Sequence, residues 1–179
     1  TIAGLGRTIK QSATRVADLV KAVKSYTYMD QAPQQEIDVH DGLDSTLMVL
    51  QHRLNEVTVS RDYNRRLPRI TAYGSELNQV WTILLDNAAD ALAGSGSICL
   101  RTSLENDYVL VECIDDGPGI PADQQHRLFE PFFTTKPVGQ GTGLGLSIAR
   151  RIVVERHNGM INAHSRPGET CFQVFLPIA

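Results

Sequence analysis

Polar side chains and glycines gather in four short clusters along this 179-residue sequence. The first is Asp86-Asn87-Ala88-Ala89-Asp90, late in a stretch with helical periodicity. In a helix, Asn87 and Asp90 would lie three residues apart and share one side. The side-chain oxygen of Asn is a good ligand for Mg²⁺, which prefers oxygen atoms. A polar outer face of the helix is the alternative interpretation.

The second cluster, Asp115-Asp116-Gly117-Pro118-Gly119-Ile120, directly follows an apolar, strand-like run. An acidic residue at a strand end can accept a hydrogen bond from a ligand. The glycines that follow allow the backbone to come close to a flat ring. An ordinary Pro-Gly turn would produce the same dipeptide without any ligand.

The third and fourth clusters lie in one long segment, residues 116–142, rich in Gly, Pro and Thr. This segment is long for a connection in a compact domain, which indicates a functional, mobile lid. The third cluster, 129–136, places three Phe beside hydroxyls and Lys136, although its aromatic rings could also anchor the loop to the core. The fourth, 139–146, leads into a helix, where exposed backbone N–H groups and the helix dipole favour phosphate.

Common phosphate and hydrolase motifs do not fit the fourth cluster. No Gly in the chain is followed by Lys, which excludes a P-loop, and the third Gly of a dinucleotide-binding motif is missing. The run from Gly145 to Ala149 departs from the hydrolase elbow at its last residue, so a structural role is expected for Ser147.

The elements that must position these clusters follow from hydrophobic periodicity. We expect a helix after Ser75, a plausible N-cap, with this buried face: Leu77, Val80, Trp81, Leu84, Leu85, Ala88 and Leu92. Further helices are expected over 43–54 and 144–157. Strands are expected over 37–40, 57–63, 69–73, 98–104, 108–114, 160–164 and 171–176. This order predicts an α+β two-layer sandwich with helices on one face of a mostly antiparallel sheet.

A heptad pattern precedes this domain. Apolar and small residues step by three and four from Ile2 to Tyr26, which is typical of a bundle or coiled-coil helix. Such a helix needs partners, so the sequence predicts one long bundle helix over 1–32 and a globular domain over 33–179. A helix packed on its own domain is the alternative.

Composition narrows the function classes. Net charge is −3 with Lys and Arg scattered, so no nucleic-acid partner is expected. No apolar run approaches a membrane span, and the start does not resemble a signal peptide, so we expect a cytoplasmic location without membrane contact by these residues, the cytoplasmic part of a membrane sensor being the alternative. Cys99, Cys113 and Cys171 fit no metal-binding spacing and are expected as free, buried thiols.

Together, the order and spacing of the clusters resemble the ATP-binding domain shared by histidine kinases, type II topoisomerases, mismatch-repair ATPases and heat-shock chaperones. The clusters match its N, G1, F and G2 boxes, and Gly168 to Phe172, ending in Leu176-Pro177, matches the G3 box. The resemblance covers residues 37–176. Phe-Phe-Thr-Thr-Lys followed by Gly-Thr-Gly-Leu-Gly-Leu-Ser is most similar to a sensor histidine kinase, and the heptad segment is similar to the second helix of its dimerisation hairpin.

The resemblance implies a set of contacts to ATP and Mg²⁺. Asn87 would coordinate the metal, Asp115 would accept a hydrogen bond from the adenine amino group, and Gly119 and Thr170 would complete a pocket. Lys136 would contact phosphate from the lid. The remaining implied nucleotide-binding residues are Asp90, Gly117, Ile120, Gly141, Thr142, Gly143, Leu144, Gly145 and Leu146.

Two positions depart from the family pattern. Ile83 stands where many histidine kinases have a second Asn and the hydrolysing relatives have Glu, and an aliphatic side chain cannot act as a general base. Asp90 stands where many histidine kinases have a cation, so that charge is missing or supplied elsewhere. Asp90 could instead organise a metal-bound water.

A phosphoacceptor motif on a bundle helix is not found in the sequence. All five histidines are expected to be non-acceptors: His40, His52, His126, His157 and His164. We therefore expect a catalytic fragment that delivers the γ-phosphate of ATP to a histidine outside this sequence. The partners implied are a homodimer formed through the hairpin and a response regulator receiver domain. A slow ATPase, or a regulatory module with a vestigial site, are the alternatives.

Overall fold

The computed structural model describes residues 33–136 and 141–178. The expected bundle helix over 1–32 lies outside the described residues. The elements, in chain order, are β1 (Gln35–Ile37), α2 (Val39–Val49), β2 (Val57–Tyr63), β3 (Ile70–Ala72), α3 (Gly74–Leu92), β4 (Gly96–Glu105), β5 (Tyr108–Asp115), α4 (Ala122–Gln125), α5 (Gly145–Arg151), the π-helical turn η1 (Ile152–Arg156), β6 (Met160–Arg166) and β7 (Glu169–Pro177).

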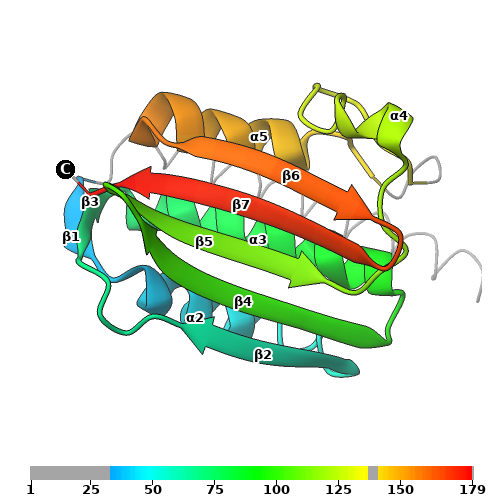
Figure 1. The fold of residues 1–179 in the computed structure, drawn as a ribbon, viewed down its shortest axis with the longest axis horizontal. Helices are drawn as coiled ribbons and strands as arrows, with labels where there is room; N and C mark the ends of the chain where they lie inside the picture. Colours follow the sequence, from blue (N-terminus) through cyan, green and yellow to red (C-terminus); the bar gives the residue numbers. More distant parts are fainter. Residues whose placement is uncertain (1–32, 137–140, 179) are drawn as a thin grey trace, which may run out of the picture. The chain divides into compact units, whose positions relative to one another are not determined.

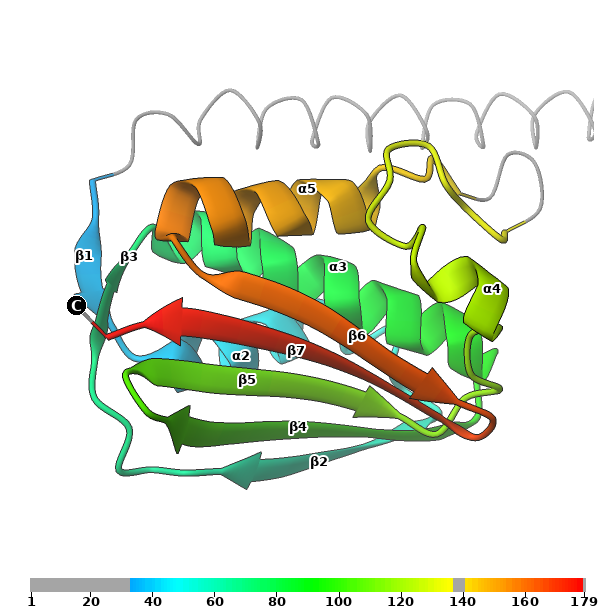
Figure 2. The same cartoon turned by 45° about the horizontal axis from the view of Figure 1, so that its top comes forward.

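The main sheet has five strands in the order β2-β4-β5-β7-β6. All neighbours are antiparallel except β2 and β4, which are parallel and in register from Val57–Gly96 to Tyr63–Thr102. The helices α2, α3 and α5 cover one face of this sheet (Figures 1 and 2). The α+β two-layer sandwich expected from the sequence is therefore confirmed, with a mixed sheet.

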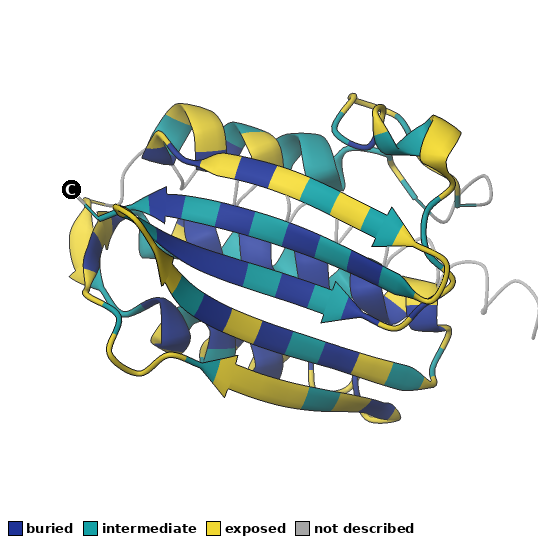
Figure 3. Ribbon diagram, in the orientation of Figure 1, coloured by how far each residue is buried: buried dark blue, intermediate teal, exposed yellow. Residues whose placement is uncertain are grey.

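The core lies between the helices and the covered face of the sheet. The whole expected stripe of α3 is buried, including Trp81, and so are inward residues of the central strands such as Ile98, Val111 and Val174. Strand residues alternate between buried and more exposed along β4 and β7 (Figure 3). This alternation is the period-2 signal that predicted the strands from the sequence.

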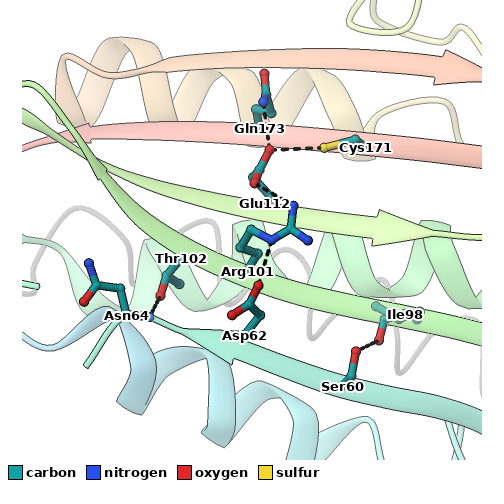
Figure 4. A network of polar contacts seen from close by, with 9 residues as sticks. All are labelled: Ser60, Asp62, Asn64, Ile98, Arg101, Thr102, Glu112, Cys171 and Gln173. Carbon is teal, nitrogen blue, oxygen red and sulfur yellow. Dashed lines mark hydrogen bonds and ion pairs between the residues drawn. The ribbon is translucent and has the colours of Figure 1, made fainter. Parts of the chain in front are cut away.

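The opposite face of the sheet carries a polar network (Figure 4). Arg101 pairs with Asp62 at 2.9 Å and approaches Glu112 at 3.7 Å. Glu112 in turn accepts hydrogen bonds from Gln173 and, at 3.6 Å, from the thiol of Cys171. All three cysteines are free, as expected, but only Cys113 is fully buried. Cross-strand polar pairs of this kind suit a face exposed to water.

Two helix starts differ from the sequence prediction. The expected extended piece 37–40 is split, because the Asp38 carboxylate accepts a hydrogen bond from the His40 N–H and starts α2 at Val39. That helix also ends at Val49 rather than at 54. Ser75 is not an N-cap, since α3 begins at Gly74 and its cap residue, Tyr73, makes no side-chain capping bond.

A small second sheet was not expected. It pairs β1 with β3, from Gln35–Ala72 to Ile37–Ile70. No helix among the residues described is long and apolar enough to cross a membrane.

A buried polar cluster joins the start of α3 to the end of η1. Glu76, only 1% exposed, receives Arg156 at 3.0 Å, and the Arg156 guanidinium lies 4.5 Å from the Tyr73 ring centroid. His157 is also buried. Its Nε2 accepts the Tyr73 N–H at 3.1 Å, so the ring is neutral and Nδ1 donates to the Ile152 carbonyl at 2.9 Å.

The ion pair predicts a stability effect. Arg156→Met leaves the Glu76 carboxylate buried without its cation, and removing one partner of a buried pair costs about 3–5 kcal/mol. Because Arg156 is partly exposed, we expect a loss of about 2–3 kcal/mol in the free energy of unfolding, measured by urea denaturation. The control Arg166→Met breaks the exposed pair with Glu169 and should cost under about 1 kcal/mol. Equal losses in the two variants would contradict this role for the Glu76 pair.

His157 predicts a pH dependence. Burial lowers the pKa of His157 below its ordinary value of 6.5, so the unfolded chain binds a proton more readily than the folded one. Its contribution to stability is present above pH 6.5 and is lost as the pH falls below it, at up to about 1.4 kcal/mol per pH unit.

The test is the difference in unfolding free energy between the wild type and His157→Gln from pH 7.5 to 5. Gln offers an acceptor for Tyr73 and a donor for Ile152 but does not titrate. The wild type should lose stability relative to this variant as the pH falls, whereas the exposed control His126→Gln should run parallel to the wild type. A constant difference between the wild type and His157→Gln would refute the assignment.

Candidate functional site

Asp115 ends the central strand β5 and is 3% exposed. Its Oδ1 accepts the Gly117 N–H at 3.0 Å. Burial raises the pKa of this carboxyl, while the hydrogen bond from Gly117 favours the ionised form and opposes the shift. A carboxylate held in this way is a strong acceptor at the edge of the core.

Thr170 lies beside Asp115 on the neighbouring strand β7, where the two residues pair in register, and it is equally buried. Its hydroxyl lies 2.9 Å from the Ser165 hydroxyl. Ser165 also accepts the N–H of Ile120 at 2.8 Å, which ties the loop after Asp115 to the β6–β7 hairpin. Gln125 strengthens this tie by donating to the carbonyls of Ile120 and Ser165. The sequence had indicated Ile120 and Thr170 but neither Ser165 nor Gln125.

Two glycines after Asp115 allow the loop backbone to pass close to the Asp115 carboxylate and to the β6–β7 hairpin. A Cβ on Gly117 would lie 2.7 Å from Asp115 Oδ1 and 3.3 Å from the Ala91 Cβ on α3. Gly119 has φ +85°, and a Cβ there would lie 2.3 Å from the Arg166 carbonyl oxygen. Any side chain at either position would push the loop away from Asp115 or from the hairpin.

A second group lies on the same helix, α3. Asn87 and Asp90 share one side, as their spacing predicted, and the Lys136 ammonium contacts both. It lies 3.4 Å from Asn87 Oδ1 and forms an ion pair with Asp90. The structure thus brings the lid lysine onto the proposed metal ligand.

Arg53, in the turns after α2, joins this group and was missed from the sequence. Its Nη2 lies 2.6 Å from Asp90 Oδ1, and its Nε lies 3.1 Å from Asp86 Oδ1. The second contact is an ion pair without hydrogen-bond geometry, so that Asp86 oxygen accepts no hydrogen bond. Desolvation raises the pKa of Asp86, and Arg53 opposes the shift. No local pattern around Arg53 indicates that it would lie beside residues more than 30 positions away.

The glycine-rich loop closes onto the Phe cluster. The Phe132 N–H donates to the Gly143 carbonyl at 2.8 Å, and a Cβ on Gly143, which has φ +67°, would lie 2.4 Å from the Phe132 carbonyl carbon. Gly141 packs against Thr134 and Lys136, and Gly145 against Ile83. Phe132 is 75% exposed and does not anchor this segment to the core, whereas Phe129 and Phe133 are half-buried.

The helix α5 begins at Gly145, and its cap residue, Leu144, makes no side-chain capping bond. Thr142 Oγ1 instead accepts the Leu144 N–H at 3.3 Å, and Leu146 lies half-exposed in the first turn. The N–H groups of this first turn therefore lack a side-chain cap and remain suited to an anion. Gly139 and Gln140 lie outside the described residues.

The predicted residues thus form two groups that meet on α3. Asp115, Gly117, Gly119, Ile120 and Thr170 surround the strand ends, and Asn87, Asp90, Lys136 and Gly141 lie near the C-terminal half of α3. Ala91, which contacts the Gly117 position, is the residue after Asp90 and connects the two groups. No cluster of three His, Cys, Asp or Glu that could hold a metal ion occurs in the described part of the chain. A metal ion here would be coordinated by Asn87 and by oxygen atoms of a bound ligand.

Comparison with known proteins agrees with this geometry. The family described as histidine kinase-, DNA gyrase B- and HSP90-like ATPase matches residues 73–179. The sensory histidine kinase/phosphatase NtrB of Rhodobacter capsulatus is 35% identical over 96% of this chain and 51% of its own length. The sensor kinase CckA of Brucella abortus is 37% identical over 94% of this chain and 20% of its own. The chain therefore spans about half of the first relative and a fifth of the second.

Solved structures share the fold. The nucleotide-free catalytic domain of histidine kinase ThkA is 28% identical, with a TM-score of 0.74 over 81% of this chain and 95% of that domain. ThkA in complex with the response regulator protein TrrA has a TM-score of 0.77 at 23% identity, over 96% of this chain and 49% of that one. The chain belongs to the histidine kinase-, DNA gyrase B- and HSP90-like ATPase family, and within it to the ATP-binding catalytic domains of sensor histidine kinases.

Proposed function

We propose that this chain binds Mg-ATP between the ends of β5 and β7 and the C-terminal half of α3, and delivers the γ-phosphate to a histidine on a dimerisation helix. The observation that carries the proposal is the pairing of a buried carboxylate, Asp115, with a separate polar group at Asn87 and Lys136, both adjoining α3. The Asp115 end suits a neutral ring with an amino group, and the Asn87–Lys136 end suits a phosphate chain with its metal ion.

At the adenine end, Asp115 would accept the hydrogen bond of the ring amino group. The orientation of this carboxylate is restricted, because its Oδ1 already accepts the Gly117 N–H and Thr170 lies beside it on the next strand. A donor-bearing ring edge satisfies a carboxylate in a site that excludes most water. The close backbone at Gly117 and Gly119 leaves room for a flat ring.

At the phosphate end, Asn87 would hold Mg²⁺ through its side-chain oxygen. The bound ion would supply charge neutralisation for phosphoryl transfer. The donor fits this ion, although Lys136 now lies on the same oxygen and must move because two cations cannot share it. Lys136 would then contact a phosphate. The loop from Gly141 to Leu146 would contribute backbone N–H groups, with Asp90 beside the metal.

The chain's own part in the transfer is positioning. Phosphoryl transfer needs alignment and charge stabilisation more than covalent help from the protein. The position one turn before Asn87 is the aliphatic Ile83, which packs on Gly145 and cannot activate water. This arrangement favours transfer to a histidine over hydrolysis.

The wider setting is also proposed. The heptad segment 1–32 would be the second helix of a dimerisation hairpin, 33–179 the catalytic domain, and the whole protein a homodimer that phosphorylates a response regulator receiver domain. The ThkA complex with TrrA, whose fold this chain shares, supports that partner class.

Adenine recognition predicts the effect of Asp115→Asn. The amide would present a donor where the ring amino group needs an acceptor, so Mg-ADP affinity should fall about tenfold to a hundredfold, measured by calorimetry. The control Asp62→Asn changes an exposed carboxylate on the opposite face of the sheet and should bind like the wild type. Equal affinity in Asp115→Asn and the wild type would exclude this pocket assignment.

Metal binding predicts that Asn87→Ala uncouples the nucleotide from Mg²⁺. The wild type should bind ADP at least several-fold more tightly with Mg²⁺ than with EDTA, whereas Asn87→Ala should show nearly the same affinity in both. The control Asn162→Ala lies exposed on β6 and should keep the metal effect. An undiminished Mg²⁺ effect in Asn87→Ala would place the ion elsewhere.

A further inference from the structure

Four charged side chains from three separate parts of the chain meet beside Asn87. Asp86 and Asp90 come from α3, Arg53 from the turns after α2, and Lys136 from the lid. Arg53 lies between the two carboxylates, at 3.1 Å from Asp86 and 2.6 Å from Asp90. Lys136 shares Asp90 with it.

The charges of this cluster sum to zero, since two carboxylates face two cations. Without Arg53, only Lys136 would remain to balance Asp86 and Asp90. The net charge beside Asn87 would then be −1, and Lys136 would be held more firmly by Asp90. Both changes oppose the approach of phosphate groups, because like charges within a few ångströms repel each other.

Arg53 is placed to act through these carboxylates rather than through the ligand. Its two ion-pair partners, Asp86 and Asp90, are both acidic, and it contacts Asp90 through the carboxylate oxygen that Lys136 does not use. The side chains are 33–42% exposed, so water and salt screen them and the effect is moderate.

We propose that Arg53 is a positioning residue for the nucleotide's phosphates: it neutralises Asp86 and Asp90 so that Lys136 is released to phosphate when Mg-nucleotide binds. This rests on the proposed function. It explains how a carboxylate can stand at position 90 beside a phosphate site, because Arg53 neutralises the charge of Asp90.

The test is calorimetric titration of Mg-ADP and Mg-ATP into four variants of the whole chain. Arg53→Met should weaken binding about threefold to tenfold, more for ATP than for ADP and less at high salt. Arg53→Lys should recover most of the loss. Asp90→Asn should tighten binding about threefold, and Arg53→Met with Asp90→Asn should return close to the wild type.

The control Arg65→Met removes an equal charge at an exposed position over Tyr63 and should leave affinity unchanged. Wild-type affinity in Arg53→Met would overturn the inference while leaving the nucleotide site in place. So would a double variant as weak as Arg53→Met alone, since Arg53 would then act on the ligand directly or through the fold. No binding of Mg-ADP by the wild type would instead remove the proposed function itself.

Discussion

The burial of a single carboxylate at the end of a central strand organises this domain. Asp115 lies almost out of water, where a charge is costly unless hydrogen bonds support it. That support comes from the Gly117 N–H, which can reach the carboxylate only because Gly117 has no side chain to collide with it. The loop that follows must then pass close to the β6–β7 hairpin, where Gly119 and Ser165 fit it. The buried carboxylate thus requires Gly117 directly, while Gly119 and Ser165 fit the path of the loop that follows it.

The helix α3 connects that acid to the rest of the site. One face supplies the core through Trp81 and its neighbours, and the other carries Asn87 and Asp90. Because both faces belong to one rigid element, packing of the core fixes where the polar face lies relative to β5. The spacing between Asp115 and the Asn87–Asp90 face of α3 is therefore set by the hydrophobic core.

Much of this arrangement follows from sequence, for a physical reason. Alternation along β4 and β7 and the apolar stripe of α3 are local patterns, and each correctly predicted its element. Contacts between distant segments leave no such trace. The parallel pairing of β2 with β4, the β1–β3 sheet and the contact of Arg53 with Asp90 all join residues far apart in the chain. The helix starts at Val39 and Gly74 were missed because Asp38 competes as a cap and Tyr73 does not cap at all.

The expected lid, residues 116–142, follows directly after the central strand β5. β5 and β7 are neighbours in the sheet, and the chain between them runs through α4, α5, η1 and the edge strand β6 (Figure 1). Lengthening a connection between two elements is cheap, since doubling the length of a flexible loop adds only about 0.6 kcal/mol of closure entropy. Within this architecture, insertions and deletions between α4 and α5 can accumulate with little effect on the sheet. The same scaffold can therefore evolve new segments between α4 and α5 while the Asp115 end of β5 stays unchanged.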